Sequence, residues 1–219
     1  QLKASDDQKV RIQSMMLLDT NNVPDFELKD FSENSILEYS ESIRGTYTDK
    51  QSNILKSAIQ YLTDAFPEKN KQLRKISIPT LVYMADIAED KEIKPMYFRQ
   101  WFEFFTEEDE LMEDYKTFCS TGSTKLEKVQ GRLAVMTKSF CKYHEIEIPE
   151  ELKDMVADVE EKLAAKKESE AMLIDDVMEK PSEEMQGNPE DEMPVEEFPG
   201  NTEERNLDVD KEETSDPSE

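Results

Sequence analysis

Charge is divided very unevenly along this chain, and the division limits which part of it can fold. The 219 residues hold 52 Asp and Glu against 27 Lys and Arg, a formal net charge of −25. Residues 168–219 carry 20 of the acids and 3 of the bases, a net charge of −17, which leaves 32 acids and 24 bases, net −8, for residues 1–167. A segment this acidic, with five prolines and few large apolar side chains, cannot bury enough apolar area to offset its ordering entropy. We therefore predict a helical domain over residues 1–167 and a disordered acidic tail over residues 168–219.

Scarce glycine and the spacing of apolar residues both indicate that the domain is helical. Strand-rich folds need many turns, which commonly recruit glycine, and the whole chain has 5 glycines. Apolar residues recur at helical spacing in segments that several capping residues, prolines and glycines delimit. These segments are residues 5–18, 32–43, 48–66, 79–88, 95–105, 106–118, 124–143 and 149–163. The prediction is an all-α fold, an irregular multi-helix bundle of about eight helices.

Local signals predict where several helices begin. Ser5 and Thr48 each stand three residues before a glutamine, the spacing of a capping box. Ser32 and Thr106 are predicted to cap two further helices. The apolar stretch within residues 172–178 either continues the last helix or docks on a partner, and continuation is the favoured interpretation.

The aromatic segment of residues 97–105 is the densest apolar feature of the sequence. Four of its members fall on one helical face: Phe98, Trp101, Phe102 and Phe105. That spacing favours packing in the core over a platform on which nucleic-acid bases stack. Tyr97 and Phe104 fall outside this face, so they are the aromatic residues expected to contact a partner.

The sequence contains no pattern typical of a catalytic or metal site. His144 is the single histidine, and its neighbours supply no second ligand for a metal ion and no triad. Cys119 and Cys141 are interpreted as two small buried thiols. The acids of residues 107–114 are interpreted as a solvated helix face. We expect no catalytic residue, no cofactor and no metal, and an enzyme that uses buried carboxylates is the least favoured function.

Targeting signals are also missing from the sequence. No apolar run approaches the roughly 18–20 residues that span a bilayer, and no signal-peptide pattern is present. We therefore expect a cytoplasmic protein with no membrane partner. Because the chain begins at Gln1 rather than Met, we also expect a fragment of a longer protein.

Two groups of basic residues stand out in this acidic chain. The helix predicted over residues 124–143 carries Lys125, Lys128, Arg132, Lys138 and Lys142, on an arc expected to face away from its apolar seam. The second group, within residues 69–75, includes Lys71, Arg74 and Lys75. Three interpretations remain open: a solvated face that pairs with acidic helices, a contact with a nucleic-acid phosphate backbone, or a docking surface for the chain's own acidic tail. The first is favoured.

Several short segments resemble a known family. They are residues 11–18, 43–48 and 122–125, together with residues 93–95 and the aromatic segment behind them. They resemble the helical region downstream of the ParB-like nuclease fold in GmrSD-type restriction and partition proteins of Firmicutes and their mobile elements. The chemistry of that family rests on an upstream motif of the Asp-Gly-Gln-Gln-Arg kind, which does not occur in this sequence. No catalytic residue is therefore carried over.

The resemblance covers most of residues 1–167, and it implies a function. This would be a non-catalytic helical domain of a ParB-like DNA-processing or defence protein, which serves assembly or nucleic-acid positioning. The alternative is a stand-alone protein-interaction or adaptor module whose acidic tail recruits a partner or mimics DNA.

Overall fold

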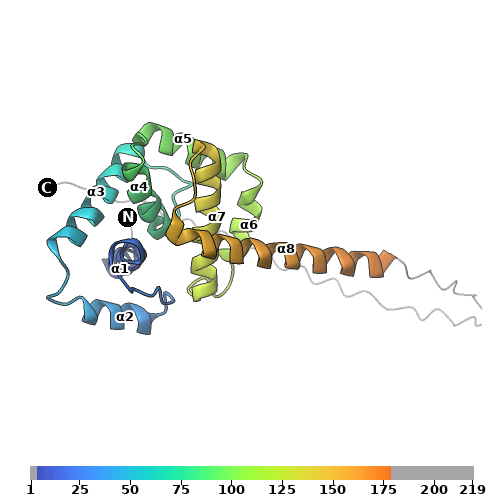
Figure 1. Cartoon of the computed structure of the whole chain (residues 1–219), viewed down its shortest axis with the longest axis horizontal. Coiled ribbons are helices and arrows are strands. Elements are labelled where there is room, and N and C mark those ends of the chain that lie inside the picture. Colours follow the sequence, from blue (N-terminus) through green and yellow to red (C-terminus); the bar gives the residue numbers. More distant parts are fainter. Residues whose placement is uncertain (1–3, 179–219) are drawn as a thin grey trace, which may run out of the picture. The chain divides into compact units, whose positions relative to one another are not determined.

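The computed structural model describes residues 4–178 and contains eight helices and no strand within them. This confirms the all-α prediction. The helices are α1 (Ala4–Asn22), α2 (Glu33–Ser42), α3 (Asp49–Ala65), α4 (Ile78–Asp90), α5 (Pro95–Glu107), α6 (Leu111–Phe118), α7 (Leu126–His144) and α8 (Glu150–Met178) (Figure 1). Residues 179–219, and with them most of the predicted disordered tail, lie outside the described residues.

Helix α8 runs through the predicted domain boundary at residue 167. It begins directly after Pro149, as predicted, and it extends to Met178. The apolar stretch within residues 172–178 therefore continues the last helix, which confirms the favoured interpretation. Leu163 still packs on the core, whereas residues 164–169 are exposed. The composition therefore changes near the point where α8 no longer packs apolar side chains on the core, and not where the helix ends.

Helix α4 lies at the centre of the bundle because nine of its 13 residues are apolar. It packs against α1, α3 and α7, and Leu81, Met84 and Ala85 are completely buried. Full burial of one large apolar side chain contributes about 1.5–3 kcal/mol, so a helix buried all round is a strong anchor for its neighbours. Although α4 is so apolar, no helix within residues 4–178 is long and apolar enough to cross a membrane.

The predicted aromatic face of α5 is confirmed, because its four members are all buried. The Trp101 ring meets the Phe140 ring of α7 edge to face, with centroids 4.9 Å apart. Its indole Nε1 donates a 3.0 Å hydrogen bond to Ser139 Oγ, also on α7. Tyr97 is exposed and Phe104 is half-buried, so neither belongs to the buried face.

The predicted N-caps are correct at α2 and α3. Ser32 Oγ accepts a hydrogen bond from Ser35 N at the start of α2. Thr48 and Gln51 form a reciprocal capping box at α3: Thr48 Oγ1 accepts from Gln51 N, and Gln51 Oε1 accepts from Thr48 N. Such a cap stabilises a helix by about 1 kcal/mol.

The other two predicted caps are wrong. Ser5 lies inside α1, which already begins at Ala4. Thr106 lies inside α5, where its hydroxyl donates to Phe102 O, a bond that threonine can make within a helix. The residue that supports the start of α6 is Asp109, whose Oδ1 accepts from Leu111 N at 2.9 Å.

Candidate functional site

Lys128 and Arg132, in the first two turns of α7, donate hydrogen bonds to the end of α6. Arg132 Nη1 donates to Phe118 O at 2.9 Å and to Ser123 O at 2.8 Å, and Lys128 Nζ donates to Thr117 O at 2.8 Å. Carbonyls at the C-terminal end of a helix lack helical partners and favour nearby cations. Arg132 is only 2% exposed. The predicted outward arc is therefore wrong for Arg132, because its position borders the apolar seam of α7.

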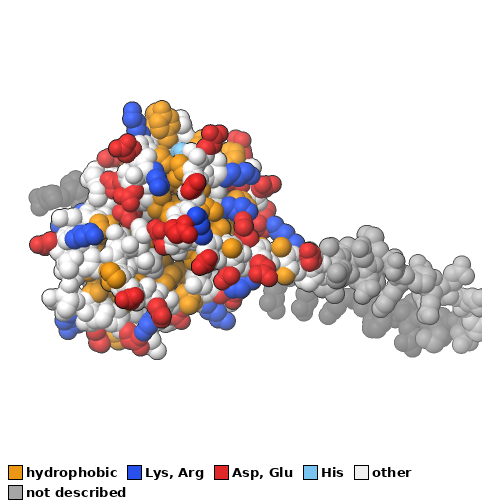
Figure 2. All heavy atoms as spheres, in the orientation of Figure 1, with side chains coloured by type: hydrophobic (Ala, Val, Ile, Leu, Met, Phe, Trp, Pro, Cys, Tyr) orange, Lys and Arg blue, Asp and Glu red, His pale blue; other side chains and the backbone are white. Residues whose placement is uncertain are grey.

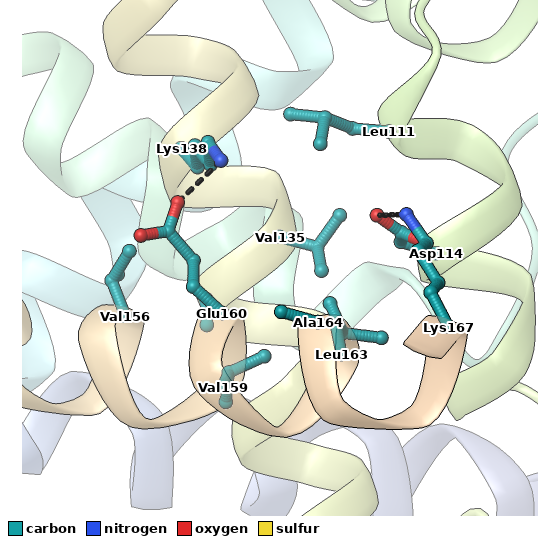
Figure 3. A pocket seen from close by; sticks show the side chains of 11 residues that line it. Leu111, Asp114, Val135, Lys138, Val156, Val159, Glu160, Leu163, Ala164 and Lys167 are labelled. Carbon is teal, nitrogen blue, oxygen red and sulfur yellow. Dashed lines mark hydrogen bonds and ion pairs between the residues drawn. The ribbon is translucent and has the colours of Figure 1, made fainter. Parts of the chain in front are cut away.

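The last basic residues of α7 form ion pairs with neighbouring acids. Lys138 pairs with Glu160 of α8 (Figure 3), and Lys142 Nζ lies 3.2 Å from Glu110 Oε1. On the face drawn in Figure 2, acidic and basic side chains are interleaved and form no continuous basic stripe. This end of α7 therefore fits the favoured interpretation, a solvated face that pairs with acidic helices.

The two predicted basic groups meet at a cavity of about 550 Å³, formed by α1, the start of α2, residues 75–76 and the segment around the start of α7. Its cationic side chains are Lys9, Lys75 and Arg132, and the acidic Glu33 is also part of its lining. Ser32, Ser123 and Thr124 add hydroxyl groups, and Phe31, Ile36 and Ile76 add apolar surface. Phe31 N donates to Thr124 O at 2.7 Å, so a backbone hydrogen bond joins the two loops that line it. We call this the cationic cavity.

The two lysines of the cationic cavity are already engaged, but weakly. Lys9 Nζ lies 2.6 Å from Glu33 Oε1, and this hydrogen bond raises the pKa of Lys9. Lys75 Nζ lies 2.6 Å from Asp6 Oδ1. All four side chains are between 37% and 84% exposed, so solvent screens both ion pairs. An incoming anion can therefore displace either carboxylate at small cost.

Arg132 is the unusual member of the cationic cavity. It forms no ion pair with any acid in the described part of the chain, and its Nε has no hydrogen-bond partner there. Burial lowers the pKa of its guanidinium, because a charge removed from water loses solvation. A buried charge is normally paired, and leaving one without a counter-ion costs several kcal/mol. The carbonyl oxygens of Phe118 and Ser123 supply partial negative charge to Arg132, but no carboxylate of the described residues does so.

The remaining predicted contact residues are placed elsewhere. Lys125 is exposed at the N-cap of α7, and Lys71 is exposed beside a separate shallow cavity. Arg74 lines a third cavity, next to Tyr115. Lys9 is not among the predicted residues, because it follows the acids Asp6 and Asp7 in the sequence and only the fold brings it to Lys75.

The buried carboxylates serve three separate structural networks. Asp19 joins α1 to α2 and α3 through hydroxyl and amide donors. Asp109 Oδ2 accepts from Ser139 Oγ at 2.5 Å, and Asp114 forms a 2.8 Å ion pair with Lys167 (Figure 3). The interpretation of residues 107–114 as a solvated face is therefore wrong for Asp109 and Asp114, which are buried. Each of the three acids is bonded in its own network, so none of them is paired with another as acid and base.

The two cysteines and the histidine also pack within the fold. Cys141 is buried, as predicted, and burial raises the pKa of its thiol to about 11; Cys119 is half-buried, and burial raises the pKa of its thiol as well. Thiols with a raised pKa are poor nucleophiles. His144 packs its ring on Phe140, with centroids 4.6 Å apart. Within residues 4–178 no three His, Cys, Asp or Glu side chains are grouped so that they could hold a metal ion.

No protein-family model, curated protein or solved structure matches this chain. The resemblance to the helical region of ParB-like nuclease proteins therefore stays a prediction. What the domain binds has to follow from the cationic cavity itself.

Proposed function

We propose that the helical domain is a non-catalytic interaction module that binds an acidic segment of a partner protein at the cationic cavity. The observation that carries this proposal is the convergence of Lys9, Lys75 and Arg132, which come from distant parts of the sequence. Arg132 contributes a buried positive charge without an acidic partner among the described residues. An anionic group from another molecule supplies that partner, through charge-assisted hydrogen bonds that are about twice as strong as neutral ones.

A nucleic-acid backbone suits the domain less well. Duplex binding depends on many phosphate contacts spread over a surface. Lys128 instead donates to a backbone carbonyl, and the acids Glu160 and Glu110 beside Lys138 and Lys142 would repel a phosphate backbone. Residues 1–167 also carry a net charge of −8, which repels a long polyanion more than a short peptide with few charges. The apolar surface inside the cationic cavity further favours a peptide, because apolar side chains next to an acidic one can be buried there.

Fluorescence anisotropy with defined probes tests this function. The full chain is titrated with a set of labelled synthetic peptides that vary the spacing of Glu and Leu, and in parallel with single-stranded and duplex DNA oligonucleotides. We expect acidic peptides to bind, and the double variant Lys9→Ala/Lys75→Ala to weaken them at least tenfold, since hydrogen bonds to charged groups contribute about 1.5–3 kcal/mol. The matched control is Lys142→Ala, which removes a lysine with an ion pair outside the cationic cavity.

Two results would overturn the proposal. One is that no acidic peptide binds. The other is that DNA binds and Lys142→Ala weakens it as much as the double variant does, because the outer end of α7 would then be the binding surface. That second result would favour nucleic-acid positioning, the function that the ParB-like resemblance implies.

A further inference from the structure

The hydrogen-bond donors of Arg132 are only partly used. A guanidinium has five N–H donors in a planar fork. Nη1 donates to two backbone carbonyls, whereas the buried Nε donates to no acceptor in the described residues. A buried donor without an acceptor costs about 1–3 kcal/mol. Because Arg132 lines the cationic cavity, an oxygen-rich anion in that cavity is the group that could complete its bonding.

The charges around the cationic cavity distinguish between kinds of anion. Lys9 and Lys75 are each neutralised by one exposed carboxylate, Glu33 and Asp6, while Arg132 is not. A carboxylate ligand brings a single negative charge, so it can neutralise Arg132 but cannot also replace Glu33 and Asp6. A phosphate monoester brings a charge of about −1.5 to −2 and three acceptor oxygens, so it compensates the arginine and most or all of the charge of one lysine.

The segment before α7 adds donors of the kind that phosphate prefers. Ser123 and Thr124 line the cationic cavity immediately before the 19-residue helix α7, whose start has no side-chain cap. Their hydroxyl groups can donate hydrogen bonds to phosphate oxygens. The cavity volume of about 550 Å³ falls within the range of about 300–1,000 Å³ that is usual for small-ligand sites. A phosphorylated side chain and a neighbouring apolar residue fit this space.

We infer that the cationic cavity recognises a phosphate monoester, carried by a phosphorylated side chain of the partner segment. The identity of the carrier rests on the proposed function, whereas the phosphate recognition rests on Arg132, Lys9 and Lys75. The same group occurs in free phosphorylated small molecules, so the experiment has to separate the two sources.

Isothermal titration calorimetry on the full chain tests this inference. The probes are a phosphoserine peptide, the same peptide with two Glu in place of the phosphoserine to match its charge, the unphosphorylated peptide, and inorganic phosphate. We expect the phosphopeptide to bind at least tenfold more tightly than the Glu peptide. Lys9→Ala/Lys75→Ala should remove this preference, and both lysines are partly exposed, so the fold should persist. The matched control Lys153→Ala, which breaks an exposed ion pair on α8, should leave the preference unchanged.

Each outcome separates the two proposals. Equal affinity for the phosphopeptide and the Glu peptide overturns phosphate recognition and leaves the interaction module standing. Saturable binding of inorganic phosphate that depends on Lys9 and Lys75, without binding of any peptide, supports phosphate recognition and overturns the protein partner. No binding of any probe overturns both.

Discussion

Substitution of Gly131 tests how closely α6 and α7 approach. Gly131 lies in the middle of α7, where glycine costs about 1 kcal/mol relative to alanine. A Cβ atom at this position would lie 2.3 Å from Phe118 Cδ1, 2.4 Å from Cε1 and 2.5 Å from Cγ. Rotation of the ring about its own axis cannot relieve the contact with Cγ, so the ring or the helix has to move by about 1 Å. Overpacking of this kind costs about 1–3 kcal/mol, at least as much as the gain in helix propensity.

We therefore expect Gly131→Ala to lower the free energy of unfolding by up to about 2 kcal/mol, although the same change at an open helical position stabilises a protein. Urea unfolding followed by far-ultraviolet circular dichroism measures the difference. In a Phe118→Ala background the clash is gone, so Gly131→Ala should there raise the free energy of unfolding by up to about 1 kcal/mol. A stabilising effect of Gly131→Ala in the unaltered chain would refute the close packing, whether or not the Phe118→Ala background folds.

Two further substitutions test polar side chains, the half-buried His144 and the buried Ser139. Burial lowers the pKa of His144 below its ordinary value of 6.5. Between the folded and the unfolded pKa the unfolded chain therefore binds more protons than the folded chain. The free energy of unfolding then decreases as the pH falls below about 6.5. His144→Gln removes the only histidine, so the urea midpoint should change less between pH 7.5 and pH 5.5 than in the unaltered chain. An unchanged pH dependence would contradict the lowered pKa of His144. Ser139→Ala removes the buried hydrogen-bond partner of Trp101 Nε1 and Asp109 Oδ2. We expect it to lower the free energy of unfolding by about 1–3 kcal/mol, measured by urea unfolding followed by Trp101 fluorescence. A loss below about 0.5 kcal/mol would show that the network is not buried.

The helices could be predicted because their signals are local. Thr48 and Gln51 carry their capping box within four residues, and the apolar spacing around Phe98 and Trp101 encodes one helical face. Thr106 was misassigned because a threonine near a helix end can either cap the next helix or bond back to the preceding turn. Local sequence does not decide between these two roles.

The candidate site could be predicted only in part, because it depends on contacts between distant segments. The clusters of basic residues in the sequence predict Lys75 and Arg132 as contact residues. That both line one cavity with Lys9 follows from how α1, α2 and α7 pack. Charge spacing also suggested an exposed Arg132, since a basic residue at the edge of an apolar seam is usually solvated. Its burial follows from the carbonyls at the end of α6, which no pattern in α7 encodes.

Phosphate titration by nuclear magnetic resonance tests the cationic cavity most directly. The ¹⁵N-labelled full chain is titrated with inorganic phosphate at constant ionic strength, and the Arg132 Nε–Hε signal is followed together with the backbone amides of Ser123 and Thr124. We predict saturable shifts of these signals, while the amides of Lys138 and Lys142 stay in place. Shifts confined to Lys138 and Lys142, or no saturable shift at all, would contradict an anion site at Arg132.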